Sequence, residues 1–146
     1  MFVHRCGTDY AYTLQGWLKG VNSDVLNPSK DMGGDGLAAS PTNSKVGRDA
    51  FSYSLNYYAG DYAAIEATKW SNVVNRFETG RANSYLFNAR NDLYNGNISA
   101  MVTNMAQPKL YTSAANEQPT LQPQGMAYKY DQLNRIKNAN AYTNLN

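Results

Sequence analysis

One short residue pattern occurs twice in this chain, near its beginning and near its end. The first copy is Tyr10-Ala-Tyr12-Thr13-Leu-Gln-Gly16-Trp-Leu18, and the second is Tyr128-Lys-Tyr130-Asp131-Gln-Leu-Asn134-Arg-Ile136. Each copy has two aromatic residues one position apart, then a small polar residue, a Gly or Asn, and an aliphatic residue at matching spacings. A recurring unit of this kind usually serves an architecture rather than a reaction.

Elementary geometry predicts a hairpin in the second copy. Tyr128 and Tyr130 would share one face of a strand, because alternate side chains point the same way. Asp131 can bond backbone groups of a following turn, and Asn134 tolerates the positive φ that such a turn needs. Ile136 would then begin the returning strand. The alternative is an ordinary hairpin at each end of an unrelated β domain.

The first copy predicts the same element. Tyr10 and Tyr12 take the positions of the paired aromatic residues, Gly16 that of the turn residue and Leu18 that of the returning aliphatic residue. Aromatic side chains favour half-buried pleated surfaces, where they pack against neighbouring strands. Each copy is therefore predicted to fold as strand, tight turn and strand.

Other elements are predicted between the two copies. Phe51–Tyr58 alternates as a strand, with Phe51, Tyr53, Leu55 and Tyr57 on one face. Apolar residues at helical spacing predict one short helix over residues 63–78. Asn95-Gly96 predicts a hairpin over Asn91–Met101. The predicted fold is mainly β, with antiparallel hairpins and long irregular loops.

Composition agrees with the predicted β fold and argues against a nucleic-acid-binding or membrane-spanning protein. Much of the 42% hydrophobic content comes from 12 Tyr, so we expect buried aromatic stripes rather than a deep aliphatic core. The 13 basic and 11 acidic residues are interspersed, and no basic run predicts a nucleic-acid groove. No stretch reaches the ~20 apolar residues of a membrane span.

No residue set in the sequence predicts catalysis, a cofactor or a metal. His4 and Cys6 are too few for a metal site or a nucleophile–base pair. Asp31-Met-Gly-Gly-Asp35-Gly36 has two carboxylates beside flexible glycines, but it lacks the closing Glu of a calcium loop. We interpret it as a glycine-driven turn, with weak calcium binding as the alternative. The sequence therefore predicts no enzyme.

The paired-tyrosine pattern resembles the tyrosine-aspartate (YD) repeat of the RHS family of large secreted and cell-surface proteins. The second copy matches closely, whereas the first departs at Thr13, where the family prefers Asp. Three further stretches look like the segment before the core domain of some bacterial RHS proteins: Asp31–Gly36, Gly47–Tyr58 and Gly60–Tyr62. The resemblance leaves about residues 63–92 and 105–125 poorly matched.

The resemblance implies a fold and a function. RHS-like proteins wind YD hairpins into a hollow β shell that encloses a C-terminal toxin-like cargo or presents an adhesive surface. Residues 1–146 would be a single YD-repeat segment of a longer secreted or cell-surface protein, with flanking repeats and the cargo as partners. No signal peptide is visible at Met1. The family's self-cleaving core motif is not visible either, so no protease role is implied.

The residues to which the resemblance assigns a structural role are Tyr10, Tyr12, Gly16, Leu18, Tyr128, Tyr130, Asp131, Asn134 and Ile136. A second hypothesis is a carbohydrate-binding or adhesive module, in which exposed Tyr and Trp rings stack on sugars. The direction of the rings distinguishes the two hypotheses. Packed rings favour a wall, and a row of exposed coplanar rings favours sugar recognition.

Overall fold

The computed structural model describes residues 5–26, 30–36, 43–63, 77, 86, 89, 91–106, 122–143 and 145. Within this part of the chain the fold is mainly β, as the sequence predicts. Its strands are β1 (Arg5–Cys6), β2 (Tyr10–Tyr12), β3 (Leu18–Val21), β4 (Val46–Gly47), β5 (Phe51–Asn56), β6 (Ala100–Met105), β7 (Gln124–Tyr130) and β8 (Ile136–Tyr142).

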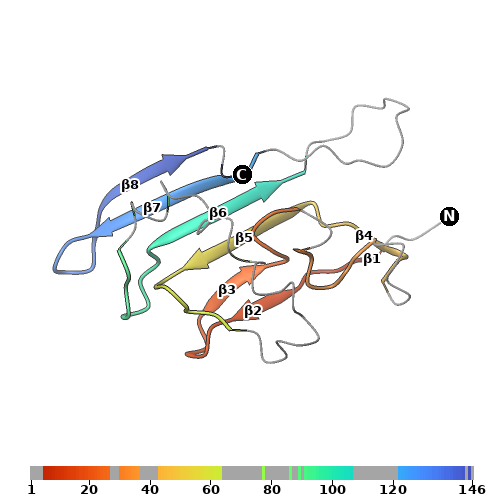
Figure 1. Cartoon of the computed structure of the whole chain (residues 1–146), viewed down its shortest axis with the longest axis horizontal. Coiled ribbons are helices and arrows are strands. Elements are labelled where there is room, and N and C mark those ends of the chain that lie inside the picture. The colour runs from red at the N-terminus through yellow and green to blue at the C-terminus, as the bar shows by residue number, and fades with distance from the viewer. Residues whose placement is uncertain are drawn as a thin grey trace.

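Six of these strands form one antiparallel sheet in the order β2-β3-β5-β6-β7-β8 (Figure 1). The hairpin β2–β3 contains the first copy of the pattern, and the hairpin β7–β8 contains the second. We call them the N-terminal and C-terminal hairpins. Strands β2 and β8 are the two edges of the sheet, and β1 pairs separately with β4 in parallel.

Small residues form the buried face of the sheet, which we call the inner face. The register aligns one row across five strands, and its members are Ala11, Gly20, Ser54, Val102 and Gly125. The side chains of Phe77, Leu86 and Leu145 are buried, and the two leucines pack with Val102 and neighbouring alanines in the core. Short side chains on the sheet let these larger residues approach its backbone closely.

The opposite, outer face carries larger and more exposed side chains. One of its rows consists of Tyr10, Val21, Tyr53, Thr103 and Gln124. Tyr10 is 59% exposed, and Phe51 and Met105, which pair at the end of β5 and β6, are 46% and 56% exposed. The sheet is therefore packed on one side and partly open to solvent on the other.

The expectation of buried aromatic stripes is wrong for the N-terminal hairpin. Tyr10 and Tyr12 lie on the exposed side of β2, and Ala11 between them is the buried residue. The buried hydrophobic residues of the described ranges are mostly aliphatic. The physical reason is that close approach to the inner face favours small side chains, which displaces the bulky rings to the outer face.

Three elements predicted between the two hairpins have different outcomes in the structure. The strand predicted over Phe51–Tyr58 ends at Asn56, and its buried side chains are the polar residues at even positions. Residues 91–99 form no strand, so the predicted hairpin at Asn95-Gly96 is wrong; instead Leu93 N–H donates to Tyr57 O at 2.8 Å. The helix predicted over 63–78 lies outside the described residues, apart from residues 63 and 77.

The packing at Gly125 gives a direct prediction. A Cβ on this residue would lie 2.8 Å from both Leu145 Cδ1 and Leu86 Cδ2, and these leucines have no solvent into which to move. Gly125→Val should therefore lower the free energy of unfolding by about 1–3 kcal/mol. Ala139→Val on exposed β8 is the control and should stay within about 0.5 kcal/mol. Equal losses in urea denaturation would contradict this packing.

Candidate functional site

The turns of the two hairpins are the same structure. Thr13 N–H donates to Trp17 O at 2.8 Å, and at the matching position Asp131 N–H donates to Arg135 O at 2.9 Å. The polar side chain of each turn also caps it: Thr13 Oγ1 accepts from Trp17 N–H at 3.1 Å, and Asp131 Oδ1 accepts from Arg135 N–H at 3.0 Å. Thr13 thus performs part of the role of Asp in the repeated pattern.

Left-handed backbone is required at one position of each turn. Gly16 has φ = 81° and Asn134 has φ = 60°, and each donates its N–H to the carbonyl of the polar residue three positions earlier. Glycine and asparagine are the residues that tolerate this conformation best. The predictions that Asp131 bonds the amides of its own turn and that Asn134 has positive φ are both confirmed.

Each returning strand contains the same irregularity. In the N-terminal hairpin the register passes from Tyr12↔Leu18 to Ala11↔Gly20, which leaves Lys19 as the extra residue. In the C-terminal hairpin it passes from Tyr130↔Ile136 to Lys129↔Asn138, which leaves the extra residue at position 137. A bulge of this kind redirects a side chain relative to normal strand alternation. Both extra residues are lysines.

The bulge directs Lys19 into the interior. Its Nζ donates to both oxygens of Asp61, at 2.8 and 3.0 Å, and to Asn56 Oδ1 at 2.8 Å. The lysine and aspartate side chains are only 3% and 6% exposed. Asp61 also accepts from Tyr57 N–H at 2.9 Å, so its carboxylate has several donors. A buried ion pair needs such additional hydrogen bonds to offset its desolvation.

Aromatic contacts hold the segment that carries this carboxylate. Tyr57 follows β5, and its hydroxyl donates to Leu18 O at 2.9 Å. Its ring lies 5.0 Å from that of Trp17, the last residue of the N-terminal turn, at an interplanar angle of 48°. The segment Phe51–Asp61 therefore binds the N-terminal hairpin through a strand, a phenol and a carboxylate. We call this segment the acceptor segment.

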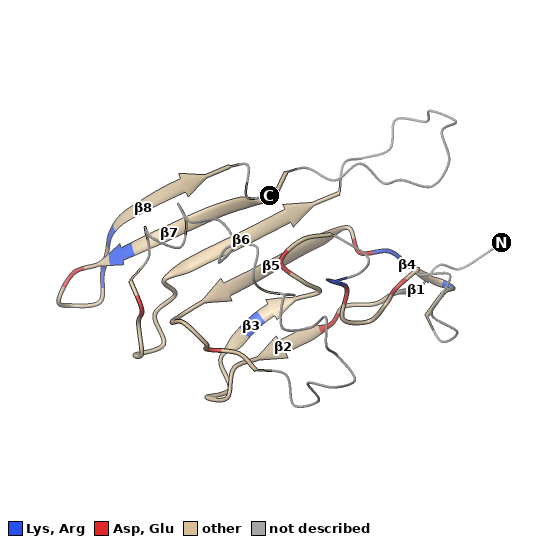
Figure 2. Ribbon diagram, in the orientation of Figure 1, with Lys and Arg blue, Asp and Glu red and all other residues tan. Residues whose placement is uncertain are grey.

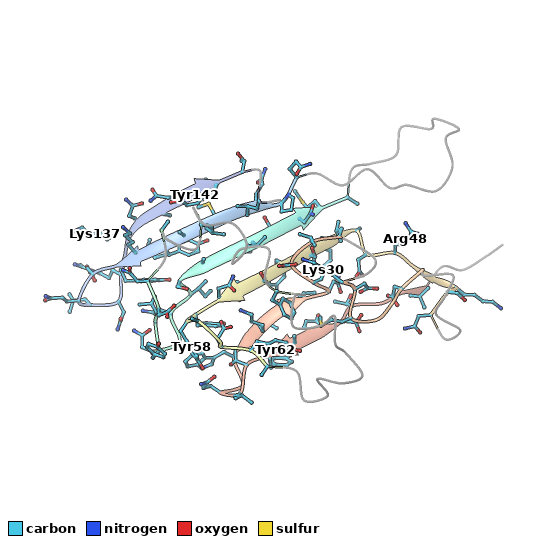
Figure 3. All side chains as sticks on the ribbon, viewed as in Figure 1. Lys30, Arg48, Tyr58, Tyr62, Lys137 and Tyr142 are labelled. Carbon is cyan, nitrogen blue, oxygen red and sulfur yellow. The ribbon has the colours of Figure 1, made fainter. Side chains whose placement is uncertain are left out.

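The equivalent lysine of the C-terminal hairpin has a different environment. Lys137 is exposed on β8, whose residues are all exposed except for half-buried Tyr142 (Figure 3). Within the described part of the chain no ion pair of Lys137 is found. The ion pair of this hairpin lies in its turn and joins Arg135 Nε to Asp131 Oδ2 at 2.7 Å. Figure 2 shows the basic residues gathered where β7 ends and β8 begins.

The structure brings all nine predicted residues into the two hairpins at equivalent places. Tyr130 is half-buried and donates its hydroxyl to Ile98 O at 2.8 Å, whereas Tyr12 at the matching position is 56% exposed. Burial raises the pKa of Tyr130, as does neighbouring Tyr128, although the hydrogen bond to Ile98 opposes this. Ile136 is 60% exposed, because β8 lies at the edge.

The ion pair of Lys19 and Asp61 is not predicted by any pattern in the sequence. Lys19 and Lys137 follow the aliphatic residue of the pattern in both copies, and this shared lysine was the available signal. Asn56 and Asp61 gave no signal in the sequence, because the bulge that turns Lys19 towards them is not visible in residue types. These three residues form a buried polar cluster in which the Lys19 and Asp61 side chains are 3% and 6% exposed.

A second polar cluster lies at the glycine-rich turn. Gly34 and Gly36 have φ of 66° and 67°, which confirms a glycine-driven turn. Asp31 Oδ2 accepts from Asp35 N–H at 2.5 Å, and a Cβ on Gly33 would contact the carboxylates of both Asp9 and Asp35. Among the described residues, no three His, Cys, Asp or Glu side chains are placed to hold a metal ion.

Burial and mutual repulsion raise the pKa of two carboxyls in this cluster. Desolvation, followed by the charges of Asp31 and Asp9, raises the pKa of Asp35. Desolvation, the charge of Asp31 and a hydrogen bond with it, and the charges of Asp35 and Asp9 raise the pKa of Asp49 to about 7. His4, which the sequence analysis weighed with Cys6 as a metal ligand, lies outside the described residues.

Exposed rings also occur at the turn end of the sheet. Tyr94 is 71% exposed and stacks on Tyr58, with ring centroids 4.7 Å apart and planes at 28° (Figure 3 labels Tyr58). Because the two rings cover each other, one face of each is used within the protein. They do not form a row with Tyr10 and Tyr12, which lie on another strand.

Comparison with known proteins adds no family. No family model, curated protein or solved structure matches this chain. The resemblance to the RHS family therefore stays a prediction. In the described residues no helix is long and apolar enough to cross a membrane.

Exchange of the turn residues between the hairpins tests their equivalence. Gly16→Asn should leave the free energy of unfolding nearly unchanged, because both residues accept positive φ. Asn134→Gly should lower it by no more than about 1 kcal/mol, because it removes only the exposed hydrogen bonds that Asn134 Oδ1 accepts from Asn95 and Asn97. Asn134→Val should lower it by about 1–3 kcal/mol, because a β-branched residue resists that conformation. Urea denaturation measures all three variants. Equal stability of Asn134→Gly and Asn134→Val would remove the argument.

The raised pKa of Asp49 predicts a pH dependence. Between its ordinary value and about 7, the folded protein binds more protons at this carboxyl than the unfolded chain does. The stabilisation is therefore complete below its ordinary pKa and is lost as pH rises through about 7. Asp49→Asn should flatten the decline between about pH 4 and pH 7 in urea denaturation. An unchanged decline would show that Asp49 does not titrate there.

Proposed function

We propose that this chain is a structural YD-repeat segment of an RHS-type secreted or cell-surface protein. Its hairpins would form part of a β shell that encloses or presents a C-terminal, toxin-like cargo. Its partners would be flanking YD repeats of the parent protein and the cargo itself. The mechanism is steric: a rigid wall keeps the cargo from its surroundings, and no residue of the wall carries out a reaction.

The observation that supports the proposal is the equivalence of the two hairpins within one sheet. They share the turn hydrogen bonds, the left-handed residue and the lysine bulge, although more than a hundred residues separate them. Between them, β5 and β6 connect β3, the returning strand of the first hairpin, to β7, the first strand of the second. This is how a wall built from repeated hairpins extends sideways.

Self-association of the purified chain tests the proposal. Strands β2 and β8 are open edges, and natural proteins cover or block such edges. A wall segment alone should be marginally stable or associate through these edges. We expect light scattering to detect species larger than a monomer and urea denaturation to give a shallow transition. A monodisperse monomer with a steep transition at high urea would contradict the proposal.

Exposed rings favour a second candidate function, a carbohydrate-binding or adhesive surface. Tyr10, Tyr12 and Tyr94 are 59%, 56% and 71% exposed, and aromatic faces stack on sugar rings. Titration with soluble oligosaccharides, followed by tyrosine and tryptophan fluorescence, tests this candidate. A saturable response that Tyr10→Ala or Tyr94→Ala abolishes would support it. No response at millimolar sugar would exclude it for the sugars used.

A further inference from the structure

In the N-terminal hairpin, strand β5 binds the edge of β3 that faces away from β2. Strand β5 pairs with β3 in the register Gly20↔Ser54 and Val21↔Tyr53. The acceptor segment then turns, and its last residue, Asp61, receives the bulge lysine at 2.8 and 3.0 Å. Asp61 N–H bonds Tyr58 O and its carboxylate bonds Tyr57 N–H, so the segment holds its own carboxylate in place.

In the part of the chain that the structure describes, no strand pairs with the same edge of the C-terminal hairpin. Strand β8 is the last strand of the sheet and is exposed along nearly its whole length (Figure 1). Ile136, Lys137, Asn138 and Ala139 stand where Leu18, Lys19, Gly20 and Val21 stand in β3. Arg135 takes the place of Trp17 and can cover an aromatic ring as a planar cation.

We infer that the outer edge of β8 is a docking site for one further acceptor segment, an extended strand whose following turn carries an Asp that pairs with Lys137. In the matching register, its Ser would lie opposite Asn138 and its Tyr opposite Ala139. The docked strand would lie slightly farther from β8 than β5 lies from β3, because a Cβ on Gly20, whose place Asn138 takes, would be 2.8 Å from Tyr53 O. The inference deepens the proposed function, on which it rests, by naming which kind of strand comes next in the wall and the ion pair that selects it.

Charge and topology favour this occupant over a second molecule of this chain. The acceptor segment of another molecule is already paired on both sides, by β3 and by β6, so it is not free to dock. Direct pairing of β8 with β8 in another molecule would bring basic edges together, with Arg135 and Lys137 on each. An added strand with a carboxylate neutralises the lysine and completes the backbone hydrogen bonds.

The experiment uses the full chain with an extra acceptor segment attached. A flexible linker of about ten Gly and Ser residues after Asn146, followed by a copy of residues 48–63, raises the local concentration of the strand. Amide hydrogen exchange is then measured for β8. We expect at least about tenfold slower exchange at those β8 amides that do not bond to β7.

Matched variants separate specific docking from any edge pairing. Asp61→Asn in the appended copy alone, or Lys137→Met in the host chain, should each remove most of the protection, and together should remove no more. Lys129→Met, an exposed lysine on β7, is the control and should change nothing. Protection that survives both changes, or a β8 that stays unprotected, would overturn the inference.

This test can fail independently of the proposed function. If the purified chain is a stable monomer but the appended segment protects β8 as expected, the wall proposal fails and the docking site stands. If the chain associates but the appended segment leaves β8 unprotected, the docking site fails and the wall proposal stands.

Discussion

One extra residue in β3, the returning strand of the N-terminal hairpin, decides which strand comes next in the sheet. The bulge turns Lys19 out of normal strand alternation and into the interior, where a buried ammonium must find acceptors. Asn56 and Asp61 supply them from the end of β5 and the turn after it. Because the lysine is satisfied only when this strand is in place, the ion pair fixes both the neighbour of β3 and its register.

The inner face provides the second constraint. Its row of small residues lets Phe77, Leu86 and Leu145 reach the backbone, so that a chain with few aliphatic residues still closes a core. A Cβ on Gly20 would lie 2.5 Å from the Phe77 ring, which shows how little space remains. Tyr10 and Tyr12 are consequently placed on the outer face, where they remain accessible for contacts with other surfaces.

The sequence predicted the hairpins because local chemistry determines them. Turn hydrogen bonds from Asp131 and positive φ at Asn134 depend on residues within five positions of one another. The ion pair could not be predicted, because Lys19 and Asp61 meet only after a bulge and a strand pairing across the sheet. The hairpin predicted at Asn95-Gly96 is wrong because of another contact between distant residues: Leu93 N–H donates to Tyr57 O instead of forming a strand opposite β6.

The central claim is that one position of a repeated hairpin is buried as an ion pair in the first copy and free at an edge in the second. Comparison of Lys19→Met with Lys137→Met by urea denaturation tests it most directly. The account predicts a loss of about 3–5 kcal/mol for Lys19→Met, which leaves Asp61 buried without its cation. It predicts a change within about 0.5 kcal/mol for Lys137→Met. Similar losses for the two variants would contradict the account.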